Sequence, residues 1–149
     1  MLYGQGGIRT QTQSTRKKGS PVATTKLRVG QKSAYKRTFT TEDVSAFADL
    51  SGDKGIQHMK PDNNGRIMVQ GLLTATLPTK LGGDMNYIAR ELAFEFLRPV
   101  FVGDTITCEG VVRKVVPGKD RLEVSISILC TNQDGKEVLR GSTEGIIRA

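Results

Sequence analysis

The sequence predicts an α+β fold in which an antiparallel sheet wraps around one apolar helix. Three observations point to this fold. A stretch beginning at Gly71 is apolar on almost every side, four strand-like segments follow it, and no internal repeat is present. Because a helix that is apolar all round must be enclosed by other elements, we expect the sheet to supply its cover.

The first half of the predicted domain holds a strand, a short helix and a long loop. Residues 29–40 alternate loosely and are expected to form the strand. The Thr-Thr-Glu-Asp run at 40–43 is typical of a helix N-terminus, and it predicts a helix over 42–50 that ends at Ser51-Gly52. One side of this helix is expected to be buried, with Val44, Phe47, Ala48 and Leu50. The Gly, Pro, Asn and Asp content of 52–66 predicts a loop.

The second half holds the buried helix and the rest of the sheet. The helix is expected to begin at Gly71 and to end at Gly82-Gly83, and Pro78 is expected to kink or shorten it. The pattern then predicts four antiparallel strands in a meander, over 87–97, 104–116, 121–131 and 136–147. A half-covered sheet of this size commonly completes its burial through a second subunit, so we expect a homodimer or a higher homo-oligomer.

The net charge of +7 is concentrated near the N-terminus. Residues 1–37 hold nine Lys and Arg and no acid, whereas residues 38–149 hold thirteen Lys and Arg and fifteen acids, a net charge of −2. We therefore expect a basic, flexible extension over 1–26 and a folded domain over 27–149. The same extension also fits a mitochondrial transit segment, so the expected location is the cytoplasm or, alternatively, the mitochondrial matrix. It lacks the interleaved aromatic residues of a nucleic-acid-binding arm, so no nucleic-acid partner is expected.

Two further classes of protein are disfavoured by composition. No stretch approaches the roughly 20 apolar residues of a membrane helix, so no membrane partner is expected. Cys108 and Cys130 lie in strand-like runs and in neither a CxxC nor a CxxH spacing. They are expected to be small buried apolar residues in a reducing compartment, which argues against a disulfide or a metal site.

The stretch LSGDKGIQH places Asp53 five residues before His58, the one histidine of the chain. An imidazole can take or give a proton near neutral pH, and a carboxylate can hold a water or act as a base. In a loop, this spacing allows both side chains to meet at one water. A histidine in a surface loop without any catalytic role is the alternative interpretation.

Gly71 stands at the expected start of the buried helix. The unpaired N–H groups there can receive an oxygen atom on which negative charge develops, such as that of a thioester or an amide. The alternative is that this glycine only lets the chain approach a neighbouring element closely.

Three segments together resemble a known family. They are FTTEDVSAFADLSGDKGIQH, GRIMVQGLLTATL and FLRPVFVGDTITCEGVV. In this order they are similar to the (R)-specific enoyl-CoA hydratases and MaoC-like dehydratases of the hotdog fold, over about residues 27–149. The family pattern is approximately A-x-x-S-x-D-x-N-P-x-H, then V-H-G-[ML]-L, then a strand ending in P-V-F-x-G-D.

The resemblance implies a reaction and roles for particular residues. Asp53 and His58 match the pair that activates the water added to a trans-2-enoyl thioester of coenzyme A or acyl carrier protein, or withdraws it in reverse. Gly71 matches the glycine whose N–H holds the thioester carbonyl, and Thr79 falls where the family often has a serine near the aspartate. No metal or redox cofactor is implied. Apolar residues of the central helix such as Leu72 are expected to line the acyl tunnel.

The sequence departs from the family pattern at two places. Gly55-Ile56 replaces the Asn-Pro pair, and Gln70 replaces the histidine before the helix glycine. The first change motivates an alternative, a non-catalytic acyl-thioester-binding subunit. A hotdog thioesterase is a further alternative, but such enzymes place an acid on or beside the central helix, and 71–83 contains neither Asp nor Glu.

Overall fold

The computed structural model describes residues 26–148, which form five strands and four helices. The predicted extension over 1–26 lies outside these residues, apart from its last residue. In chain order the elements are β1 (Lys32–Thr38), α1 (Thr41–Ser51), α2 (Ile56–Met59), α3 (Gly71–Thr74), α4 (Thr76–Asp84), β2 (Tyr87–Phe96), β3 (Thr105–Pro117), β4 (Arg121–Thr131) and β5 (Glu137–Arg148). None of the four helices in this part of the chain is both long enough and apolar enough to cross a membrane.

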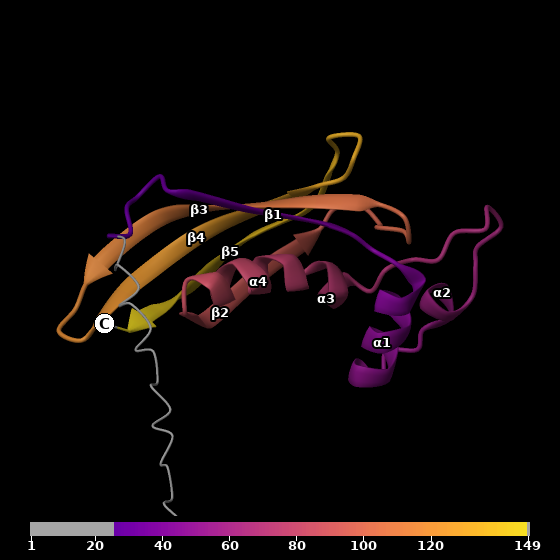
Figure 1. The fold of residues 1–149 in the computed structure, drawn as a ribbon, viewed down its shortest axis with the longest axis horizontal. Coiled ribbons are helices and arrows are strands. Elements are labelled where there is room, and N and C mark those ends of the chain that lie inside the picture. Colours follow the sequence, from indigo (N-terminus) through magenta and orange to yellow (C-terminus); the bar gives the residue numbers. More distant parts are fainter. Residues whose placement is uncertain (1–25, 149) are drawn as a thin grey trace, which may run out of the picture.

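The strands form one antiparallel sheet in the order β1-β3-β4-β5-β2. The sheet curves over α3 and α4, and α1 and α2 project from one end (Figure 1). This arrangement confirms the α+β class with a sheet wrapped around a central helix. The four-strand meander was wrong in one respect, because β2 pairs with β5 at the sheet edge and the chain then crosses to β3.

Helix α1 begins and ends where the local sequence predicted. The Thr40 side chain accepts a hydrogen bond from the Asp43 N–H, and the Asp43 carboxylate accepts one from the Thr40 N–H, which completes a capping box. Gly52 ends the helix with a φ of 78°, in the left-handed region that glycine adopts most readily. Leu50 was expected on the buried side but is 84% exposed, because α1 projects from the end of the sheet.

The predicted central helix is divided into α3 and α4. The break lies at Ala75, three residues before Pro78. Pro78 is the third residue of α4, within the first turn, where N–H groups lack partners inside the helix, so a missing N–H costs little there. Pro78 thus shortens the helix as expected, and α4 runs to Asp84, just beyond the predicted end.

The core lies between α4 and the inner face of the sheet. Its largest fully buried apolar side chains include Phe39, Leu77, Ile106 and Leu139. Cys108 and Cys130 face each other across β3 and β4 as free, buried thiols. A hydrogen bond to Cys130, together with burial, raises the pKa of the Cys108 thiol. Both cysteines therefore pack as small apolar residues.

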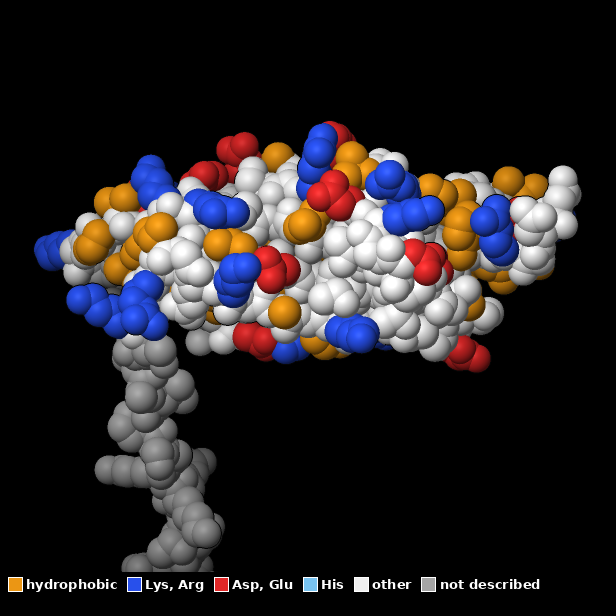
Figure 2. Space-filling view, turned by 90° about the horizontal axis from the view of Figure 1, so that it is seen from above, with side chains coloured by type: hydrophobic (Ala, Val, Ile, Leu, Met, Phe, Trp, Pro, Cys, Tyr) orange, Lys and Arg blue, Asp and Glu red, His pale blue; other side chains and the backbone are white. Residues whose placement is uncertain are grey.

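The exposed residues on the outer face of the sheet differ from those on edge strand β2 and helix α3. Lys, Arg, Asp and Glu side chains are interspersed with some apolar ones on the outer face (Figure 2). Edge strand β2 instead exposes three large apolar side chains, those of Ile88, Leu92 and Phe96. Leu72 on α3 is 66% exposed as well, although the sequence predicted a fully enclosed helix. The single sheet covers α3 on one side only, which is why Leu72 remains open.

Candidate active site

The turn after α1 directs one oxygen of Asp53 toward α2. The Asp53 N–H donates to the Ser51 hydroxyl, and the Gly55 N–H donates to Asp53 Oδ1 at 3.3 Å. This short-range pattern is typical of an aspartate that shapes its own turn. It engages Oδ1 with the backbone, while the other oxygen, Oδ2, lies 3.6 Å from His58 Nε2.

His58 is held by α2 and by a neighbouring segment. It lies on the four-residue helix α2, although the sequence predicted a loop over 52–66. Only 7% of the residue is exposed. Its Nδ1 lies 2.7 Å from the Met68 carbonyl oxygen, and its Nε2 lies 3.1 Å from Gln57 Nε2. A carbonyl can only accept and an amide nitrogen can only donate. Both contacts therefore select the neutral tautomer that carries its proton on Nδ1.

In this tautomer, Asp53 Oδ2 and His58 Nε2 are two acceptors that face each other. A water molecule between them can donate one O–H to the carboxylate and the other to the imidazole. Its oxygen lone pairs then remain free for a substrate. Because the Asp53 side chain is 49% exposed, the pair is open to solvent on the carboxylate side.

Gly71 shares a pocket with His58. It is the first residue of α3 and lines the same pocket as His58, and its N–H donates to no other group within residues 26–148. With only four residues, α3 contributes little dipole of its own, so the N–H acts mainly as a single hydrogen-bond donor. A Cβ at this position would lie 3.1 Å from the Phe96 ring, so glycine also permits a close approach to β2.

The pocket that holds His58 and Gly71 has a volume of about 370 Å³, within the usual range of small-molecule sites. Phe96, Arg98 and Pro99 form part of its wall. The motif beginning at Phe96 was noted in the sequence, but nothing in it distinguished these residues as pocket residues. The role of the Met68 carbonyl could not be predicted from the sequence, because every residue has a main-chain carbonyl.

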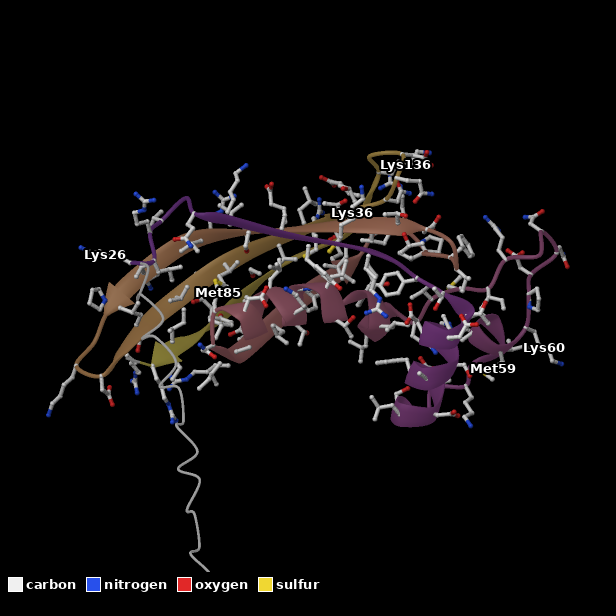
Figure 3. All side chains as sticks on the ribbon, viewed as in Figure 1. Lys26, Lys36, Met59, Lys60, Met85 and Lys136 are labelled. Carbon is white, nitrogen blue, oxygen red and sulfur yellow. The ribbon has the colours of Figure 1, made fainter. Side chains whose placement is uncertain are left out.

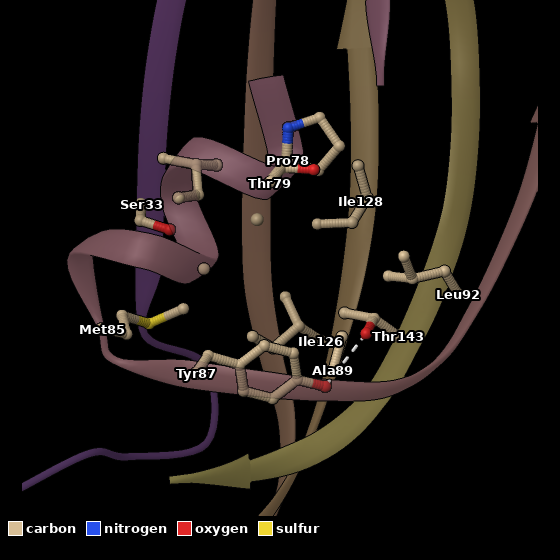
Figure 4. Close-up of a pocket in the computed structure, with 13 residues that line it drawn as sticks. Ser33, Pro78, Thr79, Met85, Tyr87, Ala89, Leu92, Ile126, Ile128 and Thr143 are labelled. Atoms are coloured by element: carbon tan, nitrogen blue, oxygen red, sulfur yellow. Dashed lines mark hydrogen bonds between the residues drawn. The ribbon is translucent and has the colours of Figure 1, made fainter. Parts of the chain in front are cut away.

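Two residues predicted to contact the substrate lie elsewhere. The Thr79 hydroxyl donates to the Ala75 carbonyl and lines a separate, mainly apolar cavity of about 120 Å³ between α4 and the sheet (Figure 4). This cavity shares no lining residue with the His58 pocket, so Thr79 and His58 line different cavities in one protomer. Leu72 is exposed and borders neither pocket, since its side of α3 faces away from the sheet.

The described residues 26–148 contain no group of three or more His, Cys, Asp or Glu side chains that could hold a metal ion. The buried Gln70 donates its amide N–H to the Val44 carbonyl, while its Oε1 has no hydrogen-bond partner among the described residues. Gln70 thereby connects α1 to the residue that precedes Gly71.

Comparison with known proteins identifies the family. The chain is 36% identical to the (R)-specific enoyl-CoA hydratase of Aeromonas caviae over 94 residues, which span 56% of this chain and 69% of the relative. The chain belongs to the (R)-specific enoyl-CoA hydratase family. No family model matches the sequence.

Further relatives agree with this family assignment. The 3-hydroxybutyryl-CoA dehydratase of Methylorubrum extorquens is 28% identical, with 76% of this chain and 75% of the relative covered. The solved structure of the (R)-hydratase from A. caviae superimposes with a TM-score of 0.74 at 28% identity, covering 84% of this chain and 99% of the other. The hotdog fold and the family resemblance seen in the sequence are thus confirmed.

The backbone at the position of the family's Asn-Pro pair does not require glycine. Gly55 has a φ of −53° and a ψ of 143°, and Ile56 is the first residue of α2. A Cβ at Gly55 would lie 2.8 Å from Gln57 Nε2, so the flexible Gln57 side chain would have to move. Proline is readily accepted at the helical position of Ile56. The backbone around Gly55-Ile56 therefore has the conformation that an Asn-Pro pair would also adopt.

Proposed function

We propose that the protein adds water to trans-2-enoyl thioesters to give (R)-3-hydroxyacyl thioesters, or removes it in the reverse direction. The observation that carries this proposal is the Asp53–His58 pair, whose Oδ2 and Nε2 atoms are 3.6 Å apart. His58 also lines a pocket with Gly71, whose N–H has no other acceptor within residues 26–148. One pair of acceptors for a water and one donor for a carbonyl are the groups that this reaction needs.

The steps follow from the hydrogen-bond geometry. Asp53 and His58 hold the water through its two protons, and its oxygen forms a bond to C3 of the enoyl group. The C2–C3 π electrons move toward the thioester carbonyl, whose oxygen accepts the Gly71 N–H as negative charge develops. One water proton passes to the pair, and a proton from the pair is delivered to C2. The sum is addition of one water across the double bond.

The substrate is a thioester of coenzyme A or of acyl carrier protein, and the proposed steps use only the groups of the protein and this thioester. The apolar cavity that Thr79 lines is separate from the His58 pocket, and a short acyl tail such as that of crotonyl-CoA need not enter it. Its few polar groups include the hydroxyls of Tyr87 and Thr143, which are 3.0 Å apart and bonded to each other (Figure 4). Leu92 lines this cavity and is also exposed on β2, so the cavity lies beside the sheet edge.

We also propose that the protein is a homodimer that associates through β2. This edge strand has ten residues and exposes Ile88, Leu92 and Phe96, with Leu72 of α3 exposed as well. A long apolar edge strand is a liability in a monomer and is normally covered. Light scattering should give the mass of a dimer, and Leu92→Arg should shift it toward a monomer. A wild-type monomer would refute this proposal.

The function is tested with purified protein and crotonyl-CoA, by following the loss of ultraviolet absorbance of the enoyl thioester. Asp53→Asn should reduce kcat by at least about a hundredfold, because the amide is a poor base. Asp49→Asn is the matched control, since Asp49 lies on exposed α1 and pairs with Lys54. Equal inactivity of the wild type and Asp53→Asn across chain lengths and carriers would refute the proposal.

The same assays separate the alternatives. Release of free thiol from acyl-CoA would indicate a thioesterase, and acyl-CoA binding without turnover would indicate a non-catalytic binding subunit. For the compartment, we propose the cytoplasm, and a mitochondrial matrix signal in cell fractionation would contradict this.

A further inference from the structure

A groove adjoins the catalytic pocket on the side of α2. Its walls include Lys60, Pro61, Asp62, Arg66 and Phe101, and its volume is about 510 Å³. Three further lining residues, Gln57, Met68 and Pro99, also line the catalytic pocket. The groove and the pocket are therefore adjacent, and a ligand in the groove would lie beside the pocket that contains His58.

One wall of this groove is held rigidly. The Arg66 guanidinium lies 4.0 Å from the centre of the Phe101 ring, and its Nε donates to Asp62 Oδ2 at 2.9 Å. The N–H groups of Arg66 and Asn64 bond to Asp62 Oδ1 as well. These hydrogen bonds lower the pKa of the Asp62 carboxyl, and the bond from the Arg66 N–H contributes most. The Asp62 charge is thus already matched by Arg66 and does not repel an anion strongly.

After the Asp62–Arg66 pair, Lys60 is the remaining charged residue that lines the groove. It is exposed just after α2, at the end of the molecule opposite Lys26 (Figure 3). Within residues 26–148 its ammonium group forms neither an ion pair nor a hydrogen bond, whereas Arg66 is paired with Asp62. The lining of the groove therefore carries a net positive charge, and this charge lies on Lys60.

We propose that this groove binds the phosphopantetheine arm of the thioester substrate and that Lys60 contacts its phosphate. This inference rests on the proposed function, because it takes the thioester to lie at His58 and Gly71. The arm joins an apolar dimethyl segment, two amides and a phosphate in a single chain. The groove offers apolar walls at Pro61 and Phe101, and the free cation of Lys60 at its rim.

The phosphate can come from two sources, since both coenzyme A and acyl carrier protein carry it. The chemical group that both sources share is a phosphate ester at the end of a pantetheine thioester. Charge-assisted contacts to phosphate are stronger than neutral ones, and at an exposed site they are weakened by salt. Lys60 is therefore a specificity-determining residue that should act on binding and not on the chemical step.

The test compares three crotonyl thioesters that differ only in the carrier: coenzyme A, 4′-phosphopantetheine and pantetheine, which lacks the phosphate. Dissociation constants are measured by calorimetry, and turnover is measured in parallel. For Lys60→Glu, the two phosphate-bearing thioesters should bind about tenfold more weakly, while crotonyl-pantetheine should be unaffected. The kcat should stay unchanged, and the effect should decrease with added salt.

Lys119→Glu is the matched control, because Lys119 is an exposed lysine in the turn between β3 and β4, at the opposite end of the sheet. It should bind all three thioesters as the wild type does. A further binding measurement with crotonyl-acyl carrier protein identifies the source of the phosphate. Weaker binding of this carrier by Lys60→Glu would show that the site accepts both carriers. An unchanged affinity would show that the site accepts coenzyme A alone.

The other outcomes overturn one proposal or the other. Equal weakening of all three thioesters, or of none, by Lys60→Glu would refute the phosphate site. A wild type that prefers the phosphate-bearing thioesters through Lys60 but never hydrates them would keep the groove and refute the hydratase function. A wild type that binds none of the three would refute both.

Discussion

The Nδ1 atom of His58 donates its proton to the main-chain carbonyl oxygen of Met68 at 2.7 Å, across ten residues of sequence. This bond fixes the tautomer and directs Nε2 toward Asp53 Oδ2, 3.6 Å away. The Met68 carbonyl is in turn held in place, because the Met68 N–H donates to Gln57. The position of the imidazole therefore depends on a segment that follows the loop rather than on the loop itself.

His58→Ala should affect both activity and stability. The variant loses a proton-transfer group, which should lower kcat by about a hundredfold or more. It also loses a buried ring and its bond to Met68, which should lower the free energy of unfolding by about 1–3 kcal/mol. Asp53→Asn is the control for this pair, because Asp53 is half exposed and its loss should cost activity with little stability. Turnover and thermal unfolding of both variants test the contrast, and a fully active His58→Ala would rule out the assigned role.

Gly71→Ala should reduce activity while the fold is retained. The added methyl would lie 3.1 Å from the Phe96 ring, so one or both of these groups must shift by a few tenths of an ångström. This movement at the pocket wall should displace the carbonyl-binding N–H and lower kcat/KM by about ten- to a hundredfold. Gly83→Ala is the matched control, because no atom lies within 4 Å of its added Cβ. An unimpaired Gly71→Ala would argue against an N–H contact at this position.

Ile56→Pro should leave the protein active and make it more stable by about 0.5–1 kcal/mol. Ile56 is the first residue of α2, and the preceding Gly55 already has the extended conformation that proline requires of its neighbour. Ile56→Ala removes the same exposed side chain without restricting the backbone, so only the proline variant should raise the midpoint of thermal unfolding. A lower midpoint for Ile56→Pro would show that the loop relies on a different backbone conformation.

Asp43→Asn should destabilise the protein in a pH-dependent way. Burial raises the pKa of Asp43, but the hydrogen bonds from the Thr40 N–H and the Arg37 guanidinium outweigh burial and lower it overall. A lowered folded-state pKa stabilises the fold at pH values above the unfolded value of about 3.9, and this contribution is lost as the pH falls through the folded value.

The difference between wild type and Asp43→Asn should therefore be about 1 kcal/mol at neutral pH and should shrink below about pH 4. Denaturant titrations across this range measure it. Asp49→Asn, on the same helix, serves as the control and should show a much smaller difference at neutral pH. A difference for Asp43→Asn that stays constant down to acid pH would show that the carboxylate charge is not involved.

Much of the fold could be predicted from local sequence. The alternation of Leu122, Val124, Ile126, Ile128 and Cys130 gave strand β4 its limits and its inner face, because side chains in a strand point alternately to opposite sides. The Thr40 capping box and Gly52 marked both ends of α1 for similarly local reasons. Exposure was less predictable. Leu50 and Leu72 were assigned to buried faces, and both are exposed.

The amino-acid sequence by itself determined the strands, the capped helix, the early break in the central helix and the residue types of the candidate site. Each of these depends on backbone preferences and side-chain periodicity over a few residues. Only the tertiary structure decided that β2 crosses to the far edge of the sheet, that the Met68 carbonyl sets the His58 tautomer, and that Thr79 faces a different cavity. These features depend on contacts between residues distant in the chain, whose geometry no local pattern encodes.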